Sequence, residues 1–232
     1  MKSHNMTVLS KIQKAKNQQI PLLAILLDPD KTDAYTAALP HIQSADLIFV
    51  GGSTGFHSES CIQQLRKYTN SPIVLFPGNI SQFSSEADAL LYLTLLNAQS
   101  PDILINPHIQ VAKEVLFSGI ESIPMGYILI DGHKQSSVEI ASKCQPIAQD
   151  DMDKILSTAI AGQLLGKELV YLEAGSGART PISPDIIQTV HKHLQIPIIV
   201  GGGITSPQLM IQAFRAGADV VVIGNHFEKI SR

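Results

Sequence analysis

The stretch "IIVGGGITSPQLMIQAFRAGADVVVIGN", residues 198–225, holds the pattern that decides the fold. The apolar run Ile198–Val200 is followed by three glycines, and Ser206 stands before a proline at the start of the helical pattern Gln208–Ala216. A hydroxyl residue before proline is a typical helix start. A second apolar run, Val220–Ile223, then ends at another glycine. The order strand, helix, strand, with continuous apolar runs, predicts a parallel sheet buried on both faces.

Similar apolar runs recur along the whole chain, with helical patterns between most of them. The expected strands are Leu22–Leu27, Leu47–Val50, Ile73–Phe76, Leu90–Leu96, Tyr127–Ile130, Leu169–Leu172, Ile198–Val200 and Val220–Ile223. The expected helices are a short one near Ala34–Leu39, then Ser58–Tyr68, Gln110–Phe117, Met152–Leu165, Asp185–Leu194 and Gln208–Ala216. This alternation predicts an α/β protein, a single (β/α)8 TIM barrel domain over residues 1–232. A doubly wound open sheet is the alternative, although "LLDPDK" stands where its glycine signature would follow the first strand.

The connection after the third strand departs from this pattern. Between Phe76 and Leu90 the chain reads "PGNISQFSSEADA", which is short and rich in Ser, Gly and Asn. We therefore expect a modified barrel in which a loop replaces the third helix and leaves a groove on the side.

Composition limits the partners. The chain of 232 residues carries a net charge of −3 with Lys and Arg spread along it, so nucleic acid is not an expected partner. Cys61 and Cys144 are too few for a disulfide scaffold and are expected to be buried, reduced thiols. No apolar run has the length of a signal peptide core or a transmembrane segment, which predicts a cytoplasmic protein. Transient contact with a membrane to collect a lipid remains compatible with this.

In a barrel all strands end at the same face, so the residues after them can form one site. Glycines follow the seventh and eighth strands, and free backbone amides near a helix N-terminus bind phosphate. The alternative is that these glycines only make tight turns. Asp28 ends the first strand and could hold Mg²⁺ together with the Ser53 hydroxyl, or it could belong to a loop and helix cap. Three histidines are expected in loops or at the surface without a catalytic role: His57, His108 and His133.

Six segments, in order and at matching spacing, resemble one known family. They are "ILLDPDK", "FVGGS", "PMGYILIDG", "YLEAGSGA", "IIVGGGI" and "GADVVVIGN". The chain resembles, over nearly its whole length, the geranylgeranylglyceryl phosphate synthases and the similar bacterial heptaprenylglyceryl phosphate synthases. The resemblance implies a modified TIM barrel whose side groove takes a prenyl chain, and a homo-oligomer, either a dimer or a hexamer. His133 departs from the pattern, because the family more often has glycine there.

The resemblance also implies a role for individual residues. Mg²⁺ is expected at Asp28 and Ser53, against the diphosphate of a long-chain prenyl diphosphate, foremost geranylgeranyl diphosphate. The residues expected to enclose sn-glycerol 1-phosphate are Tyr171, Leu172, Glu173, Ala174, Gly175, Ser176, Gly177, Gly202, Gly203, Gly224 and Asn225. Glu173 is expected to be catalytic, accepting the proton of the C3 hydroxyl as the ether bond forms and diphosphate leaves. A structural alternative pairs Glu173 with Arg179 or Lys167.

Two other functions fit part of the pattern. "GGGI" followed by "GN" also suits phosphate-binding barrels that are isomerases, lyases or flavin enzymes. A barrel that binds prenyl diphosphate without catalysis is the third possibility. An assay with labelled glycerol 1-phosphate and prenyl diphosphates of several lengths, followed by extraction into organic solvent, would settle most of this choice.

Overall fold

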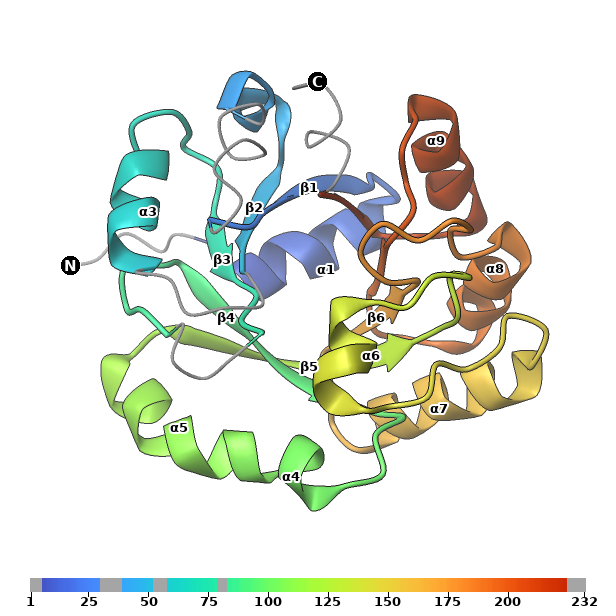
Figure 1. Cartoon of the computed structure of the whole chain (residues 1–232). Helices are drawn as coiled ribbons and strands as arrows, with labels where there is room; N and C mark the ends of the chain where they lie inside the picture. Colours follow the sequence, from blue (N-terminus) through green and yellow to red (C-terminus); the bar gives the residue numbers. More distant parts are fainter. Residues whose placement is uncertain (1–5, 30–38, 52–57, 79–82, 225–232) are drawn as a thin grey trace.

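The computed structural model describes residues 6–29, 39–51, 58–78 and 83–224. Its parallel strands form a closed barrel in which each strand pairs with the next and the last pairs with the first (Figure 1). The strands are β1 (Leu22–Leu27), β2 (Leu47–Val50), β3 (Ile73–Leu75), β4 (Ala89–Leu95), β5 (Glu121–Leu129), β6 (Leu169–Glu173), β7 (Ile198–Gly201) and β8 (Val220–Ile223). The predicted TIM barrel is confirmed.

Helices surround this barrel, as Figure 1 shows. They are α1 (Val8–Gln18), the 3-10 helix η1 (Leu39–Ser44), α3 (Ser58–Leu65), α4 (Pro101–Leu104), α5 (Asn106–Ser118), α6 (Ser137–Ser142), α7 (Met152–Leu164), α8 (Pro184–His193) and α9 (Pro207–Ala216). The predicted caps of two helices are confirmed, since the Ser183 and Ser206 hydroxyls accept from backbone N–H groups in the first turns of α8 and α9. Most of the helix predicted near Ala34–Leu39 lies outside the described residues.

Helix α1 was not predicted, and it closes the N-terminal end of the barrel. Its buried residues Val8, Ile12 and Ala15 join the core inside the barrel. The backbone amides of its first two residues donate to the Glu121 carboxylate at the start of β5, at 2.7 and 3.0 Å. The Thr7 cap and the apolar spacing of i, i+4 and i+7 are the sequence signals that indicate this helix. A cavity can therefore open at the other end of the barrel.

Strand β5 is longer than predicted and begins at Glu121 rather than at Tyr127. Pro124 lies inside it and made this part of the sequence look unlike a strand. Its carbonyl still accepts a hydrogen bond from the Glu168 backbone amide at 2.8 Å, so the proline keeps one of its two ladder positions. The short helices α4 and α6 were also missed.

The connection between β3 and β4 contains no helix in its described residues, 76–78 and 83–88. The side chains that a helix would cover here are Leu90 and Tyr92 of β4, and both line a cavity instead. The expected replacement of the third helix by a loop is confirmed for this part of the chain.

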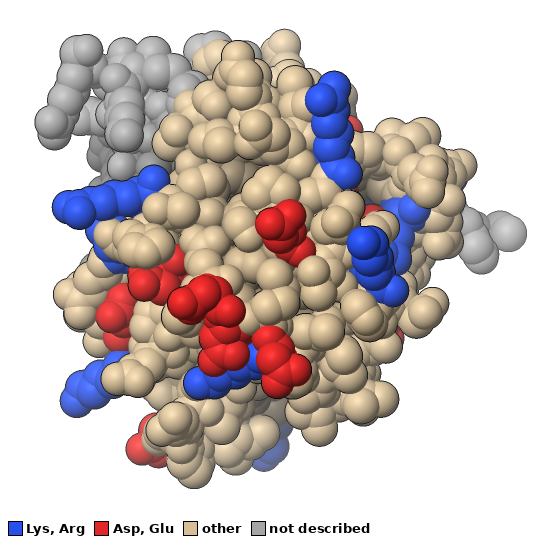
Figure 2. Space-filling view, turned by 90° about the vertical axis from the view of Figure 1, so that its right-hand side faces the viewer, with Lys and Arg blue, Asp and Glu red and all other residues tan. Residues whose placement is uncertain are grey.

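The surface on the side of α7, α8 and α9 carries charges of both signs. Figure 2 shows blue and red side chains scattered among tan ones, without a continuous blue stripe on the described part of this face. This face therefore offers no basic track for a nucleic-acid backbone. None of the described helices has the length and apolarity needed to cross a bilayer.

Candidate active site

A cavity of about 620 Å³ opens at the C-terminal end of the barrel, within the size range of small-molecule sites. One end, here called the glycine-rich end, is lined by Glu173, Ser176, Gly177, Gly202 and Gly203. The opposite side, here called the apolar groove, is lined by Phe83, Leu90, Tyr92, Leu93, Ile103, Val111 and Val115. A single cavity thus joins a polar, backbone-rich end to an apolar groove.

Glu173 is the last residue of β6 and is almost fully buried, with 6% of its surface exposed. Its Oε1 accepts the Gly175 backbone N–H at 2.7 Å, and the Tyr171 hydroxyl hydrogen-bonds the same carboxylate. Burial raises the pKa of Glu173 to about 7, because desolvation outweighs these two hydrogen bonds. A carboxylate with a pKa near neutrality is well suited to accept a proton.

The ion pairs proposed as the structural alternative for Glu173 do not occur among the described residues. Lys167 Nζ instead donates to Thr94 Oγ1 at 2.7 Å. Within the described part of the chain, Glu173 therefore has no basic side chain at ion-pair distance.

Gly202 allows the carboxylate to approach the loop after β7. Its φ is +82°, and a Cβ there would lie 2.6 Å from Glu173 Oε1 and 2.8 Å from the Gly175 backbone nitrogen. Both the backbone angle and the space therefore require glycine at this position. The consequence is a stretch of bare backbone directly beside the buried carboxylate.

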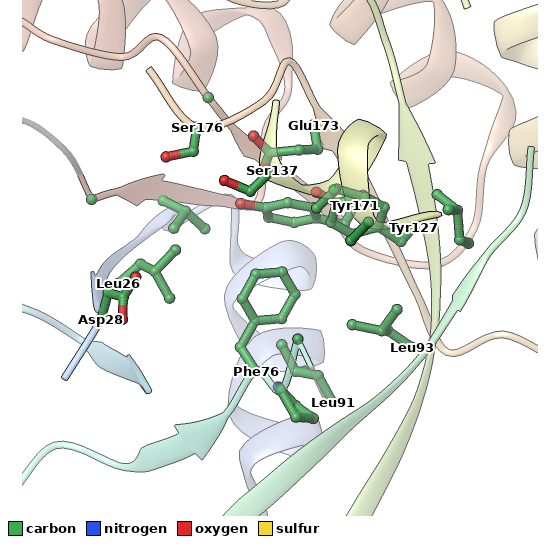
Figure 3. A pocket seen from close by; sticks show the side chains of 18 of the residues that line it. Leu26, Asp28, Phe76, Leu91, Leu93, Tyr127, Ser137, Tyr171, Glu173 and Ser176 are labelled. Atoms are coloured by element: carbon green, nitrogen blue, oxygen red, sulfur yellow. The ribbon is translucent and has the colours of Figure 1, made fainter. Parts of the chain in front are cut away.

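Three aromatic rings lie where the cavity meets the core of the barrel (Figure 3). Tyr127 and Tyr171 are stacked with ring centroids 5.2 Å apart, and Phe76 lies 5.5 Å from Tyr171 and 6.1 Å from Tyr127. Burial and the nearby Glu173 raise the pKa of both tyrosines well above the usual value. Both phenols are therefore neutral.

The structure brings most of the predicted site residues to this cavity. Those that line it are Asp28, Tyr171, Glu173, Ser176, Gly177, Gly202, Gly203 and Gly224. Leu172 and Ala174 instead pack into the layer between the barrel and its helices, because side chains alternate along β6 and just beyond it. Gly175 acts through its N–H on Glu173. Ser53 and Asn225 lie outside the described residues.

His108 was predicted to lie in a loop or at the surface, and this prediction was wrong. This histidine lies on α5, is half-buried and lines the cavity, with its ring centroid 4.5 Å from that of Tyr92. Desolvation, followed by the charge of Lys167, lowers the pKa of His108. His133 is exposed in a loop, as expected. Its φ of +56° lies in the left-handed region that glycine adopts most easily, which agrees with the expected preference of the family for glycine at this position. His57 lies outside the described residues.

The cavity residues around α6 were not predicted from the sequence. Lys134 and Ser137 line the cavity, next to the capping box in which the Ser136 hydroxyl accepts the Glu139 N–H. The sequence "SSVE", residues 136–139, is the signal that could have found this helix start.

Both cysteines are free and buried, as predicted. Among the described residues no three His, Cys, Asp or Glu side chains gather in a way that could hold a metal ion. Asp28 and Glu173 are the carboxylates that line the described part of the cavity. Any metal held at Asp28 would thus depend on oxygen ligands from a substrate, from water or from residues outside the described ranges.

A family model described as the PcrB family matches residues 12–231. The geranylgeranylglyceryl phosphate synthase of Zunongwangia profunda is 46% identical over 226 residues, which cover 95% of this chain and 97% of that protein. The archaeal enzyme of the same name from Korarchaeum cryptofilum is 38% identical over 223 residues, covering 94% and 91%.

Solved structures agree with these relatives. The (S)-3-O-geranylgeranylglyceryl phosphate synthase of Thermoplasma acidophilum, solved with its substrate sn-glycerol-1-phosphate, superimposes with a TM-score of 0.88 at 33% identity, covering 97% of this chain and 93% of that one. An N-acetylmannosamine-6-phosphate 2-epimerase of Clostridium perfringens, at 15% identity and a TM-score of 0.59, shares the fold alone. The chain therefore belongs to the PcrB family, alongside bacterial and archaeal geranylgeranylglyceryl phosphate synthases.

Proposed function

We propose that this protein is a prenyltransferase that joins the C3 hydroxyl of sn-glycerol 1-phosphate to a long-chain prenyl diphosphate, foremost geranylgeranyl diphosphate, and releases diphosphate. The observation on which this depends most is the position of Glu173. It is a buried carboxylate with a pKa of about 7, in one cavity that joins bare backbone to an apolar groove. The carboxylate can take the proton of the acceptor hydroxyl, while the bare backbone and the apolar groove suit the phosphate of the acceptor and the hydrocarbon of the donor.

The glycine-rich end suits the glycerol phosphate. The backbone at Gly202 and Gly203 has positive φ and lines the cavity between β7 and the start of α9, where amide groups favour a phosphate. Glu173 and the Ser176 hydroxyl can hydrogen-bond the glycerol from the same side (Figure 3). The relative from Thermoplasma acidophilum was solved with this substrate, which supports the assignment.

The apolar groove suits a prenyl chain. It extends from β4 to α5, and its leucine, isoleucine, valine and aromatic side chains offer a surface that gains free energy when a hydrocarbon displaces water. The described residues after β3 form no helix, and this leaves space for the prenyl chain beside β4.

The donor set around Asp28 fits Mg²⁺ held jointly with a diphosphate. Mg²⁺ is often bound by one or two carboxylates plus phosphate oxygens and water, and Asp28 supplies one carboxylate at the mouth of the cavity. When bound there, the ion would neutralise charge on the leaving diphosphate. Ser53, which lies outside the described residues, remains the proposed second ligand.

Glu173 then performs the proton transfer. Its carboxylate accepts the proton of the C3 hydroxyl while the hydroxyl oxygen forms the bond to the prenyl carbon. The Tyr171 hydroxyl and the Gly175 N–H hold the carboxylate in one orientation. We further propose a cytoplasmic homo-oligomer, a dimer or a hexamer, that contacts membranes transiently.

Labelled sn-glycerol 1-phosphate, incubated with Mg²⁺ and prenyl diphosphates of several lengths and then extracted into organic solvent, tests the proposal. Label in the organic phase, dependent on the prenyl diphosphate, is the expected result. Binding of prenyl diphosphate without extractable label would indicate a binding barrel instead. Failure with every prenyl diphosphate would favour another phosphate-binding barrel enzyme.

A further inference from the structure

We infer that Ser136, the residue that caps the start of α6, is a positioning residue for the proposed base. It packs against Gly175 and thereby fixes the backbone N–H that holds the Glu173 carboxylate. This inference rests on the proposed function, which gives Glu173 the proton transfer. It adds a residue from the loop after β5 that acts on the reaction through Gly175.

The contact between Ser136 and Gly175 is close. A Cβ on Gly175 would lie 2.7 Å from the Ser136 Cβ and 3.5 Å from its Oγ. No side chain fits between the two residues, so the backbone of Gly175 lies directly against Ser136, which is only 3% exposed. Because buried groups are closely packed, an atom added at Gly175 must displace one of the two residues.

Ser136 is itself held in place from the side of α6. Its Oγ accepts the Glu139 backbone N–H at 3.1 Å, and its own backbone N–H donates to Glu139 Oε2 at 3.4 Å, which together form a capping box. The loop after β5 is also tied to the loop after β6, because the Gly132 carbonyl accepts the Arg179 backbone N–H at 2.9 Å. Ser136 therefore meets Gly175 from a fixed position.

Gly175 transmits this position to the carboxylate. Its backbone N–H donates to Glu173 Oε1 at 2.7 Å, a short hydrogen bond to a group that can carry charge. Gly175 also meets the loop after β7, since a Cβ on Gly202 would lie 2.8 Å from both its nitrogen and its carbonyl oxygen. Packing against Ser136 and Gly202 therefore gives the Gly175 N–H a defined direction toward the carboxylate.

This hydrogen bond also affects how readily Glu173 takes a proton. Burial raises the pKa of Glu173 to about 7, whereas the hydrogen bonds from Tyr171 and from the Gly175 backbone lower it. Loss of the Gly175 bond should therefore raise the pKa further. The contact of Ser136 with Gly175 thus influences the pH at which the carboxylate becomes a base.

Other titratable groups also surround Glu173. Tyr171 on the same strand and Tyr127 on β5 are neutral phenols with raised pKa values. Strand β7 meets the carboxylate at Gly201, which has no titratable side chain, since a Cβ there would lie 3.1 Å from Glu173 Oε2. A change confined to the contact of Ser136 with Gly175 leaves all of these groups in place. The remaining titratable side chains that line the described part of the cavity are Asp28, Tyr92, His108 and Lys134.

Three variants separate the contact from the helix cap and from backbone strain. Gly175→Ala places a Cβ against Ser136, which should move the N–H away from Glu173 and raise its pKa from about 7 to about 8. Adding Ser136→Gly removes the obstructing atom while alanine stays strained at a φ of +97°, so the pKa should return toward 7. Ser136→Ala removes the cap but keeps the Cβ contact, and should leave the pKa unchanged.

The pKa is measured by NMR titration of isotope-labelled glutamate carboxyl carbons, with Glu173 assigned by the loss of its signal in Glu173→Gln. The midpoint of the pH dependence of kcat/KM should move with this pKa. An equal pKa in wild type and Gly175→Ala, or in Gly175→Ala and the double variant, would overturn the inference. A rise in Ser136→Ala as large as that in Gly175→Ala would also overturn it, because the cap alone would then explain the effect.

Ser136→Thr takes the place of Gly175→Ala if that variant does not fold. It keeps the cap and adds a methyl group to the buried contact, so the pKa of Glu173 should again rise, and an unchanged pKa would overturn the inference. The titration does not depend on turnover. If wild-type protein forms no labelled product, the proposed function fails, whereas the titration still decides whether Ser136 positions Glu173.

Discussion

The two sides of the cavity are built in opposite ways. At the glycine-rich end, Gly202 adopts a φ of +82° and the Glu173 carboxylate is held by two hydrogen bonds. The backbone and the carboxylate therefore have little conformational freedom. The apolar groove is lined mainly by hydrocarbon side chains, most of them from β4 and α5. The first side can recognise a small polar molecule through atoms in fixed positions. The second side binds a long hydrocarbon chain through the apolar surface that is removed from water. Substitutions should therefore have large effects at the first and small ones at the second.

The largest effect is expected for Glu173→Gln. The amide keeps an acceptor for the Gly175 N–H, and the Tyr171 hydroxyl can accept from its NH2 group, but it cannot take a proton. Turnover should fall by about 10²–10⁴-fold, the usual contribution of a general base. Steady-state kinetics of the purified variant measure this.

Thermal unfolding of the same variant is the control. The folded-state pKa of Glu173 is raised from 4.5 to about 7, so its contribution to stability is fully present below pH 4.5 and is lost as pH rises through 7. The free energy of unfolding of wild type should fall by about 3 kcal/mol relative to that of Glu173→Gln between pH 4.5 and pH 8. A destabilised variant with near-normal turnover would contradict the catalytic role.

Asp28→Asn should have the next largest effect, because Asp28 supplies the carboxylate proposed to hold Mg²⁺ against the diphosphate. Losing about 3 kcal/mol of charge stabilisation corresponds to roughly 10²-fold in rate with prenyl diphosphate. Calorimetric titration should show that glycerol phosphate still binds. Equal loss for both substrates would count against the metal site.

Gly202→Ala tests the narrow fit of the glycine-rich end. The new Cβ would meet Glu173 Oε1 at 2.6 Å, so we expect the KM for glycerol phosphate to rise by roughly tenfold, from strain of about 1–2 kcal/mol at a positive φ. Gly119→Ala is a matched control, because Gly119 has a φ of +71° but nothing within 4 Å of its Cβ position. Equal increases in KM in both variants would show that the effect comes from backbone strain alone and not from the contact with Glu173.

The smallest effect is expected in the apolar groove. Leu93→Ala removes hydrocarbon from its wall, which should raise the KM for prenyl diphosphate by a factor of roughly 10 or less and leave the KM for glycerol phosphate unchanged. A large drop in turnover would show that the apolar groove tolerates substitution as poorly as the glycine-rich end.

The sequence predicted the barrel because parallel strands buried on both faces are continuous apolar runs, as in Leu169–Leu172. It also predicted the residues that follow strands, such as Asp28 and Glu173, because all strands end at one face. The N-terminal helix was missed because polar Ser, Lys and Gln residues separate Val8, Ile12 and Ala15, so no apolar run marks it.

Other parts of the site could not be predicted from local patterns. The contacts among the rings of Phe76, Tyr127 and Tyr171 join β5, β6 and the residue after β3, so they depend on how the closed barrel aligns strands distant in sequence. His108 lies in a helix that covers the groove, and its sequence neighbours resemble those of a surface helix. The raised pKa of Glu173 likewise depends on burial by several strands.

Glu173 is proposed to be the base that takes the proton of the acceptor hydroxyl where the two sides of the cavity meet. The most direct test is the pH dependence of kcat/KM for glycerol phosphate in wild type divided by that in Glu173→Gln, because ionisation of the substrate phosphate cancels in this ratio. We predict that the ratio rises tenfold per pH unit and levels off above about pH 7, where the carboxylate is ionised. A ratio that is flat between pH 5 and 8 would exclude Glu173 as the base.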